Sequence, residues 1–246
     1  MKMSNQPEKI QKVLARCGVA SRRAIEEMII AERITINDEL ALIGTRVSDS
    51  DIIKVDGKLI TVANPAVTKV IIYNKPINQI CTRTDPEGRT TVFEQLPPLL
   101  TGRWISVGRL DFKTSGLLIL TDDGELANKL MHPSYEIPRV YKVRVRGQVN
   151  DQTIARLQKG LELEDGLAKF DTLEIGKSSG ANQWFTVSLH SGRNHLVRRM
   201  WREVGHPVNK LIRISFGPIE LPLDLELGQW QELSVEQLNS LQDAVG

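Results

Sequence analysis

VGRLDFKTSGLLILTDDGEL, residues 107–126, is the stretch that indicates the class of fold. Its apolar run GLLILT is short enough for a buried strand, and residues 124–133 have helical spacing. Asp111 follows one predicted strand and precedes the turn at Thr114–Gly116. A carboxylate fixed in a loop by apolar neighbours, with Arg109 nearby, is typical of a nucleophile or general base. Capping of the turn by Asp111 is the alternative interpretation.

Outside this stretch, further strands and isolated helices follow without regular alternation. The remaining predicted strands are 69–74, 103–108, 140–147, 170–176, 183–190 and 211–217. The remaining predicted helices are 151–160, 194–205 and 234–244. This order favours an α+β fold with a mixed, mainly antiparallel sheet over a doubly wound one.

The N-terminal part predicts a small separate unit. Residues 8–17 have helical spacing, and Ser21 is suited to cap a second helix. Short strands follow, and Asp56-Gly57 predicts a hairpin turn. Asn64-Pro65 is typical of a linker, so we expect domains at 7–64 and 67–244.

A second segment of chemical interest is PRVYKVRVRG, residues 138–147. In a strand, Tyr141 shares a face with Val143 and Val145, and the basic residues between them face the other way. The basic edge would suit a phosphate backbone. A core tyrosine behind a solvated charged face explains the pattern equally.

The third segment is HSGRNHLVRRMWREVGHP, residues 190–207. Asn194 is suited to cap a helix whose apolar stripe faces inward. The opposite face carries His195, Arg198, Arg199 and Arg202. These groups repel one another unless an anion meets them, which favours nucleic acid over a merely solvated face.

Composition excludes several classes of protein. The chain has 246 residues, 41% of them apolar, and a net charge of +2. It contains no apolar run long enough for a membrane span, and its first residues do not resemble a secretory signal. Two isolated cysteines fit a reducing cytosol, and the histidines lack metal-ligand spacing, so we expect no metal site. The residues alone predict a cytoplasmic two-domain nucleic-acid-binding protein with a candidate carboxylate site.

Taken together, these segments resemble the pseudouridine synthases of the ribosomal RNA branch. GRLD at 108–111, the segment 114–134 and GRNHLVRRM at 192–200 are similar to that branch's motifs, and Tyr141 stands where the family has a tyrosine. Residues 11–29 and the following hairpins resemble an S4-type RNA-binding domain. Residues 81–97 and 182–201 resemble the large-subunit subgroup rather than the small-subunit one.

The resemblance implies that a uridine of 23S ribosomal RNA is isomerised to pseudouridine without a cofactor. Asp111 would be the catalytic carboxylate, attacking the sugar or removing its 2′ proton, with Tyr141 stacked on uracil and Arg198 opposite. Contacts to RNA would come from Arg109, Arg193, Asn194, His195, Arg199, Arg202, Arg22, Arg23 and Arg33. The protein would act as a monomer. A small-subunit or other RNA substrate, and a non-catalytic ribosome-assembly role, remain as alternatives.

Overall fold

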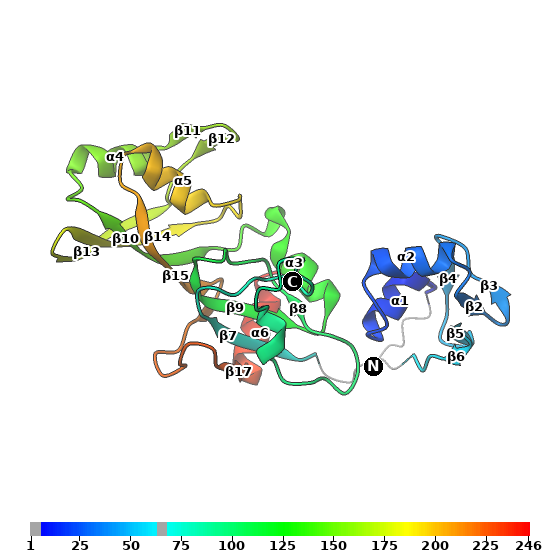
Figure 1. Ribbon diagram of the computed structural model, residues 1–246. Coiled ribbons are helices and arrows are strands. Elements are labelled where there is room, and N and C mark those ends of the chain that lie inside the picture. The colour runs from blue at the N-terminus through cyan, green and yellow to red at the C-terminus, as the bar shows by residue number, and fades with distance from the viewer. Residues whose placement is uncertain (1–5, 63–67) are drawn as a thin grey trace. The chain divides into compact units, whose positions relative to one another are not determined.

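The computed structural model describes residues 6–62 and 68–246, which form two compact units. The first consists of the described residues up to Lys69, with Pro97–Ile105 and Asp122–Gly124. The second contains the rest of the chain (Figure 1). The predicted linker at Asn64-Pro65 lies outside the described residues, so the domain limits stay a prediction. Within the described ranges, no helix has the length and apolar character that crossing a bilayer requires.

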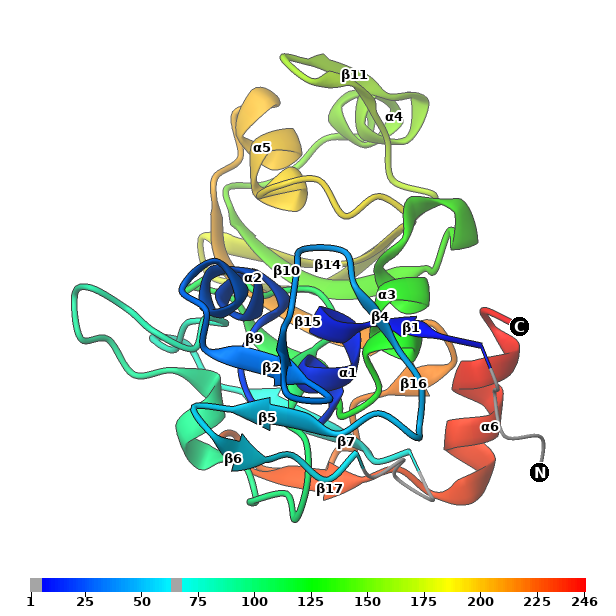
Figure 2. The same cartoon turned by 90° about the vertical axis from the view of Figure 1, so that its right-hand side faces the viewer.

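The first unit packs two short helices against small antiparallel sheets (Figure 2). Its elements are β1 (Glu8–Lys9), α1 (Ile10–Arg16), α2 (Arg22–Ile30), β2 (Ile34–Ile36), β3 (Glu39–Leu40), β4 (Arg46–Val47), β5 (Ile53–Val55) and β6 (Lys58–Leu59). The Ser21 hydroxyl accepts a hydrogen bond from the Ala24 amide, which confirms the predicted cap. Asp56 and Gly57 both have positive φ, as the predicted hairpin turn requires.

The second unit is built on one mixed sheet. Its order is β13-β14-β10-β15-β9-β7-β17, with β16 added to β15 and β8 to β9. The strands are β7 (Val70–Lys75), β8 (Ile105–Ser106), β9 (Ser115–Thr121), β10 (Arg139–Arg146), β13 (Thr172–Ser179), β14 (Asn182–Leu189), β15 (Val208–Phe216), β16 (Ile219–Glu220) and β17 (Trp230–Glu232). Of the strand pairs described in this sheet, β15 with β9 is parallel and those along the rest of the order are antiparallel. The predicted α+β class is confirmed.

Short helices and one hairpin complete this unit. They are η1 (Val92–Gln95), α3 (Gly124–Met131), η2 (Pro133–Tyr135), α4 (Asp151–Lys159), α5 (Leu196–Glu203), α6 (Val235–Asp243) and the hairpin β11 (Leu161–Leu163) with β12 (Gly166–Ala168). Figure 1 shows α4, α5 and the hairpin gathered over the part of the sheet that contains β10 and β14.

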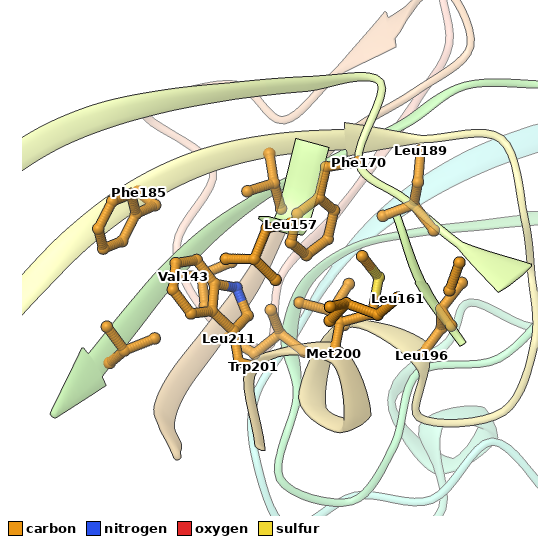
Figure 3. Packing of buried hydrophobic residues seen from close by; sticks show 14 residues of the cluster. Val143, Leu157, Leu161, Phe170, Phe185, Leu189, Leu196, Met200, Trp201 and Leu211 are labelled. Atoms are coloured by element: carbon orange, nitrogen blue, oxygen red, sulfur yellow. The ribbon is translucent and has the colours of Figure 1, made fainter. Parts of the chain in front are cut away.

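The core beneath these helices follows from the alternation in β10 and the apolar stripe of α5. Val143 and Val145 are fully buried, and Trp201 of α5 packs on Phe185 with ring centroids 4.7 Å apart (Figure 3). Tyr141 is half-buried at the edge of the same cluster. The predicted common face of Tyr141, Val143 and Val145 is therefore confirmed.

The sequence misplaced the start of α5. The residue before the helix is His195, in a left-handed conformation with φ 50°, and it makes no side-chain capping bond. The prediction of Asn194 as the cap is therefore wrong. Capping preference is a local effect, whereas this loop is held from outside by hydrogen bonds of Arg193 to the β11–β12 hairpin. A φ in this region is uncommon for a residue other than glycine and marks a constrained position.

Candidate active site

Asp111 lies in the loop between β8 and β9. The turn after it is closed by backbone atoms, because the Thr114 amide donates to the Asp111 carbonyl at 2.9 Å. The carboxylate is not the cap of this turn, so the structural alternative raised by the sequence is not realised. Its side chain is 30% exposed, and Oδ2 lies 3.2 Å from Nδ1 of His195. The strained residue before α5 therefore faces the loop carboxylate directly.

A buried lysine holds the backbone of this loop. Lys75, at the end of β7, is 0% exposed, and its ammonium donates to the carbonyl oxygens of Asp111 at 3.2 Å and Thr114 at 2.9 Å. A third bond goes to the Pro76 carbonyl at 2.9 Å. Burial lowers the pKa of Lys75 to about 8, against the opposing pull of the nearby Cys81 and Asp111 groups. The position of Asp111 is thus tied to the central sheet.

Asp111 faces a cavity of about 290 Å³. Tyr141 lines it from β10, Arg213 from β15, and Leu196 and Val197 from the start of α5. Exposed Arg109 contributes to its lining beside Asp111. A carboxylate, an aromatic ring and apolar walls therefore surround one space, with cations near them.

Arg198 is close enough to Asp111 for their charges to attract, but its hydrogen bonds go to backbone. Its guanidinium donates to the Lys113 carbonyl at 2.8 Å and the Val208 carbonyl at 3.1 Å. Burial lowers the pKa of Arg198, and the charge of Asp111 opposes that fall. The guanidinium joins the Asp111 loop to the start of β15 while adding positive potential at the carboxylate.

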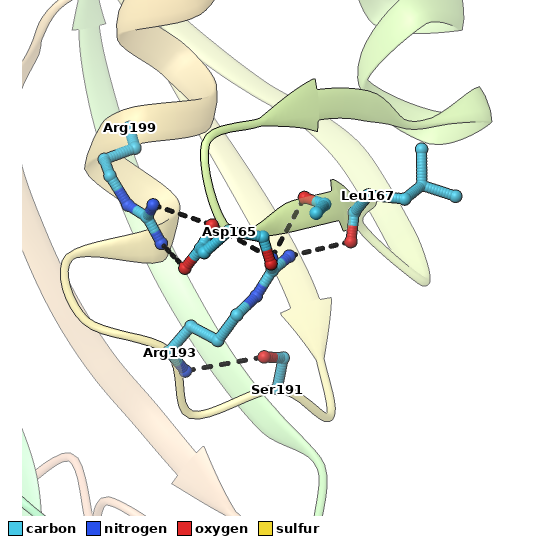
Figure 4. Close-up of polar contacts among 6 residues, drawn as sticks. Asp165, Leu167, Ser191, Arg193 and Arg199 are labelled. Atoms are coloured by element: carbon cyan, nitrogen blue, oxygen red, sulfur yellow. Dashed lines mark hydrogen bonds and ion pairs between the residues drawn. The ribbon is translucent and has the colours of Figure 1, made fainter.

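Two of the predicted RNA-binding arginines form ion pairs with an acid of this protein. Arg199 makes a bidentate pair with Asp165, the tip residue of the β11–β12 hairpin, at 2.8 and 2.7 Å (Figure 4). Arg193 donates to the carboxylate of Asp165 and to the carbonyls of Asp165, Gly166 and Leu167. The pKa of Asp165 is held below its usual range, chiefly by the hydrogen bonds from Arg199. We call these three side chains the Asp165 clasp.

The remaining predicted RNA contacts differ in how free they are. Asn194 and Arg202 are exposed beside the cavity loop and on α5. Arg22 and Arg23 are exposed in the first turn of α2, in the first unit. Arg33 is also exposed, but its Nε and Nη2 atoms donate hydrogen bonds to the two oxygens of the Asp56 carboxylate, at 2.8 and 2.7 Å. Of the three arginines predicted in the first unit, Arg33 is therefore the one already paired.

Sequence reasoning missed three residues that shape this site, namely Lys75, Asp165 and Arg213. A lysine ending the apolar strand at 69–74, and an arginine interrupting the apolar alternation of 211–217, were visible signals. Asp165 gave none, because its role depends on contacts across 28 and 34 positions of the chain. Among residues 6–62 and 68–246, no three His, Cys, Asp or Glu side chains are grouped as metal ligands would be.

Comparison with known proteins matches the sequence of this chain to a family. The model described as RNA pseudouridylate synthase matches residues 69–203, and the S4 domain model matches residues 8–53. The ribosomal large subunit pseudouridine synthase B of Haemophilus influenzae is 50% identical over 100% of this chain and 71% of that protein. The protein of the same name from Escherichia coli strain K12 is 50% identical over 97% of this chain and 83% of its own length.

A solved structure extends the likeness to the fold. The crystal structure of a pseudouridylate synthase superposes with a TM-score of 0.66 at 25% identity, covering 95% of this chain and 99% of that one. The loop carboxylate, the cavity and the basic helix all lie within the matched range 69–203, apart from Arg213 and the rest of β15. Because the family model covers more than half of the chain, and the relatives agree with it along the whole length, this chain belongs to the RNA pseudouridylate synthase family and is an isomerase with an S4 domain preceding its catalytic part.

Proposed function

We propose that this enzyme converts a uridine of 23S, large-subunit ribosomal RNA to pseudouridine, with Asp111 as its catalytic carboxylate. The observation that carries the proposal is the position of Asp111, half-buried and facing a cavity that Tyr141 also lines. The large-subunit substrate is inferred from the names of the relatives that match the full chain.

The isomerisation can be explained with three groups of this site, namely Asp111, Tyr141 and Arg198. The bond between the sugar and N1 of uracil breaks, the base turns within the cavity, and C5 bonds to the same sugar carbon. C5 then gives up its hydrogen as a proton and N1 gains a proton, so the product is an isomer of the substrate. No electron is gained or lost, so no redox cofactor is required. Asp111 either attacks the sugar carbon or removes its 2′ proton, and Arg198 provides the positive potential that favours an ionised carboxylate. Tyr141 stacks on the base.

The target base must leave its stack to reach this cavity. We assign the phosphate contacts to exposed cations, namely Arg109 and Arg202 in the catalytic part and Arg22 and Arg23 in the S4 domain. Arg193 and Arg199 instead hold the Asp165 clasp, Arg33 is largely occupied by Asp56, and Asn194 and His195 touch RNA where they line the cavity. Residues 7–64 would then bind RNA and residues 67–244 catalyse, in a cytoplasmic monomer.

The test measures tritium released from RNA labelled at C5 of uridine. We expect the wild type to release tritium from a large-subunit transcript and not from a small-subunit one. Asp111→Asn should lose at least about a hundredfold in rate while RNA affinity stays within a few-fold, because the change removes a reacting group and leaves the RNA-binding surface intact. Asp224→Asn is the matched control, since Asp224 is an exposed acid of the same unit.

Other outcomes would change the proposal in defined ways. Release from the small-subunit transcript alone would reassign the substrate. Full activity of Asp111→Asn would remove Asp111 from the mechanism. Tight RNA binding without release from either transcript, or from a partly assembled particle, would favour a ribosome-assembly role.

A further inference from the structure

Arg213 is a buried cation that the mechanism above does not use. It lies in β15, is 2% exposed, and lines the cavity that Asp111 faces. A guanidinium carries five N–H donors, and here Nε donates to the Leu117 carbonyl at 2.7 Å. Nη2 is buried and has no hydrogen-bond partner among the described residues. A buried donor left unpaired destabilises the protein, so such a group on a residue that lines a cavity points to a ligand that supplies the acceptor.

The sheet fixes where this guanidinium lies. Arg213 is directly opposite Tyr141 in the antiparallel pair of β15 with β10, so the two side chains leave the same face of the sheet. On its other side Arg213 pairs with Gly116 of β9. A Cβ on Gly116, which has φ 103°, would clash with the Arg213 carbonyl oxygen. Glycine is therefore required for β9 to approach, and the approach brings the Leu117 carbonyl to Nε.

The surroundings of Arg213 favour a neutral acceptor over a phosphate. Leu211 and Phe216 line the same cavity, and the Arg213 guanidinium lies over the Phe216 ring, 5.3 Å from its centroid. Arg139 lies over the same ring, but its guanidinium donates to the backbone carbonyls of Ile137 and His190. A phosphate would lose most of its hydration at this depth, whereas exposed Arg109 at the same cavity meets a phosphate in water. A carbonyl oxygen of the base is polar enough to accept from Arg213 and loses far less hydration.

Uracil is suited to such a donor throughout the reaction. Its edge reads carbonyl O2, N3–H, carbonyl O4, and the turn that exchanges N1 for C5 also exchanges O2 for O4. A donor placed beside one carbonyl before the turn therefore meets the other carbonyl afterwards. Cytosine breaks this symmetry, because an amino group replaces O4 and would face the guanidinium donor to donor in one of the two orientations of the base.

We propose that Arg213 recognises the flipped uracil by donating to its carbonyl oxygens before and after the base turns. This inference rests on the proposed function, in that the cavity beside Asp111 must be the reaction site. Arg213 would then be the residue that selects uracil over cytosine at that site, next to the stacking ring of Tyr141.

The test compares enzyme variants on RNA in which uridine is replaced by 2-thiouridine or 4-thiouridine, since sulfur accepts hydrogen bonds poorly. The RNA is the transcript on which the wild type releases tritium, and the product is quantified by chromatography after nuclease digestion. We expect each thio substitution to lower kcat/KM of the wild type by about 10- to 100-fold, the effect of losing a hydrogen bond from a charged donor. For Arg213→Met the same substitutions should cost at most about threefold, and Arg213→Lys should lie between.

The quantity compared between enzymes is the ratio of kcat/KM on uridine RNA to kcat/KM on thio RNA. Partial misfolding of a variant lowers both values of that variant equally, and altered folding of the thio RNA changes the ratio of every enzyme equally. Arg144→Met is the matched control, because Arg144 lies on β10 at a position that alternates away from Tyr141, and it should keep the wild-type sensitivity. Equal sensitivity of wild type and Arg213→Met would overturn the proposal, as would a wild type indifferent to both thio RNAs. Activity retained by Asp111→Asn would instead remove the proposed reaction site, and the role of Arg213 with it.

Discussion

Two charged side chains hold the loop that carries Asp111 through its backbone rather than through the carboxylate. Lys75 and Arg198 both donate to backbone carbonyls of the loop that carries Asp111, and neither makes a direct bond to its carboxylate among the contacts described. The carboxylate is left to face the cavity and His195. Lys75 is fully buried and Arg198 is partly buried, so water screens their charges from Asp111 less than it would at an open surface.

Lys75 should make stability depend on alkaline pH. Burial lowers its pKa to about 8 from an ordinary value of 10.5, so between these values the unfolded chain binds more protons than the native state. Native stability attributable to Lys75 therefore rises with pH across this window. We expect the free energy of unfolding of the wild type to rise relative to that of Lys75→Met from pH 7.5 to 9.5 in denaturant titrations, because this range lies largely between the folded pKa of about 8 and the ordinary value of 10.5.

The control for this experiment is Lys142→Met, which replaces an exposed lysine of β10. Its difference from the wild type should not change over the same range. A Lys75→Met difference that is flat with pH would contradict the assignment of a depressed pKa to the folded state.

The Asp165 clasp links the helix α5 and the loop before it to the hairpin β11–β12. Arg193 precedes the cavity-lining residues Asn194 and His195, so its bonds to the hairpin fix the loop that lines one wall of the cavity. The sequence predicted that the basic face of α5 would meet an anion. For Arg199 on that face, and for Arg193 in the loop before it, the anion described is a carboxylate of the same chain. The pattern of a single sequence shows how residues are spaced along a helix or strand. It does not show which hairpin will pack against that helix or strand.

Asp165→Asn should therefore affect turnover more than binding. The bidentate pair with Arg199 weakens, the cavity loop is held less firmly, and kcat should fall by about tenfold. RNA affinity should hold or increase and become more dependent on salt, because two arginines are released from their acid. Steady-state kinetics and RNA titrations at several salt concentrations measure both effects.

Glu162→Gln is the matched change for this test, since Glu162 is an exposed acid of β11 outside the clasp. It should leave both quantities near those of the wild type. Weaker RNA binding by Asp165→Asn with unaltered kcat would show that the clasp has no part in positioning the cavity loop.

The two units of the chain were predictable to different depths. Periodicity and turn chemistry identified the helices of both units and the long strands of the sheet, because each rests on local pattern. The strand predicted at 103–108 shortens to the two residues of β8. The two-residue strand β16, the hairpin β11–β12 and the edge strand β17 were missed, because they are too short for a period and exist through pairing. The predicted residues Asp111 and Tyr141 line one cavity, and Arg198 lies within electrostatic reach of Asp111, whereas Arg213 could be found only once the register of β15 with β10 was known.

RNA binding by the full chain should report on the first unit through its salt dependence. Arg22→Ala combined with Arg23→Ala removes two exposed cations from the start of α2. We expect weaker binding and a log–log salt slope shallower by about one to two units, as lost phosphate contacts release fewer counterions.

Arg33→Ala is the comparison within the same unit, because Asp56 already neutralises that arginine. Its effect on the slope should be smaller than that of either arginine of α2. An unchanged slope in the double variant would exclude Arg22 and Arg23 from the RNA contact.

The sheet order has a consequence for synthesis of the chain. The edge strand β17 pairs with β7, the first strand of the second unit, and the parallel partner of β9 is β15 (Figure 1). During translation β7 and β9 are synthesised early. Each keeps one edge of unpaired backbone N–H and C=O groups until residues 208–232 have left the ribosome. The first unit, whose strands pair over short separations, can complete its fold in that interval. A nascent chain would thus present a finished RNA-binding module before it has a working catalytic centre.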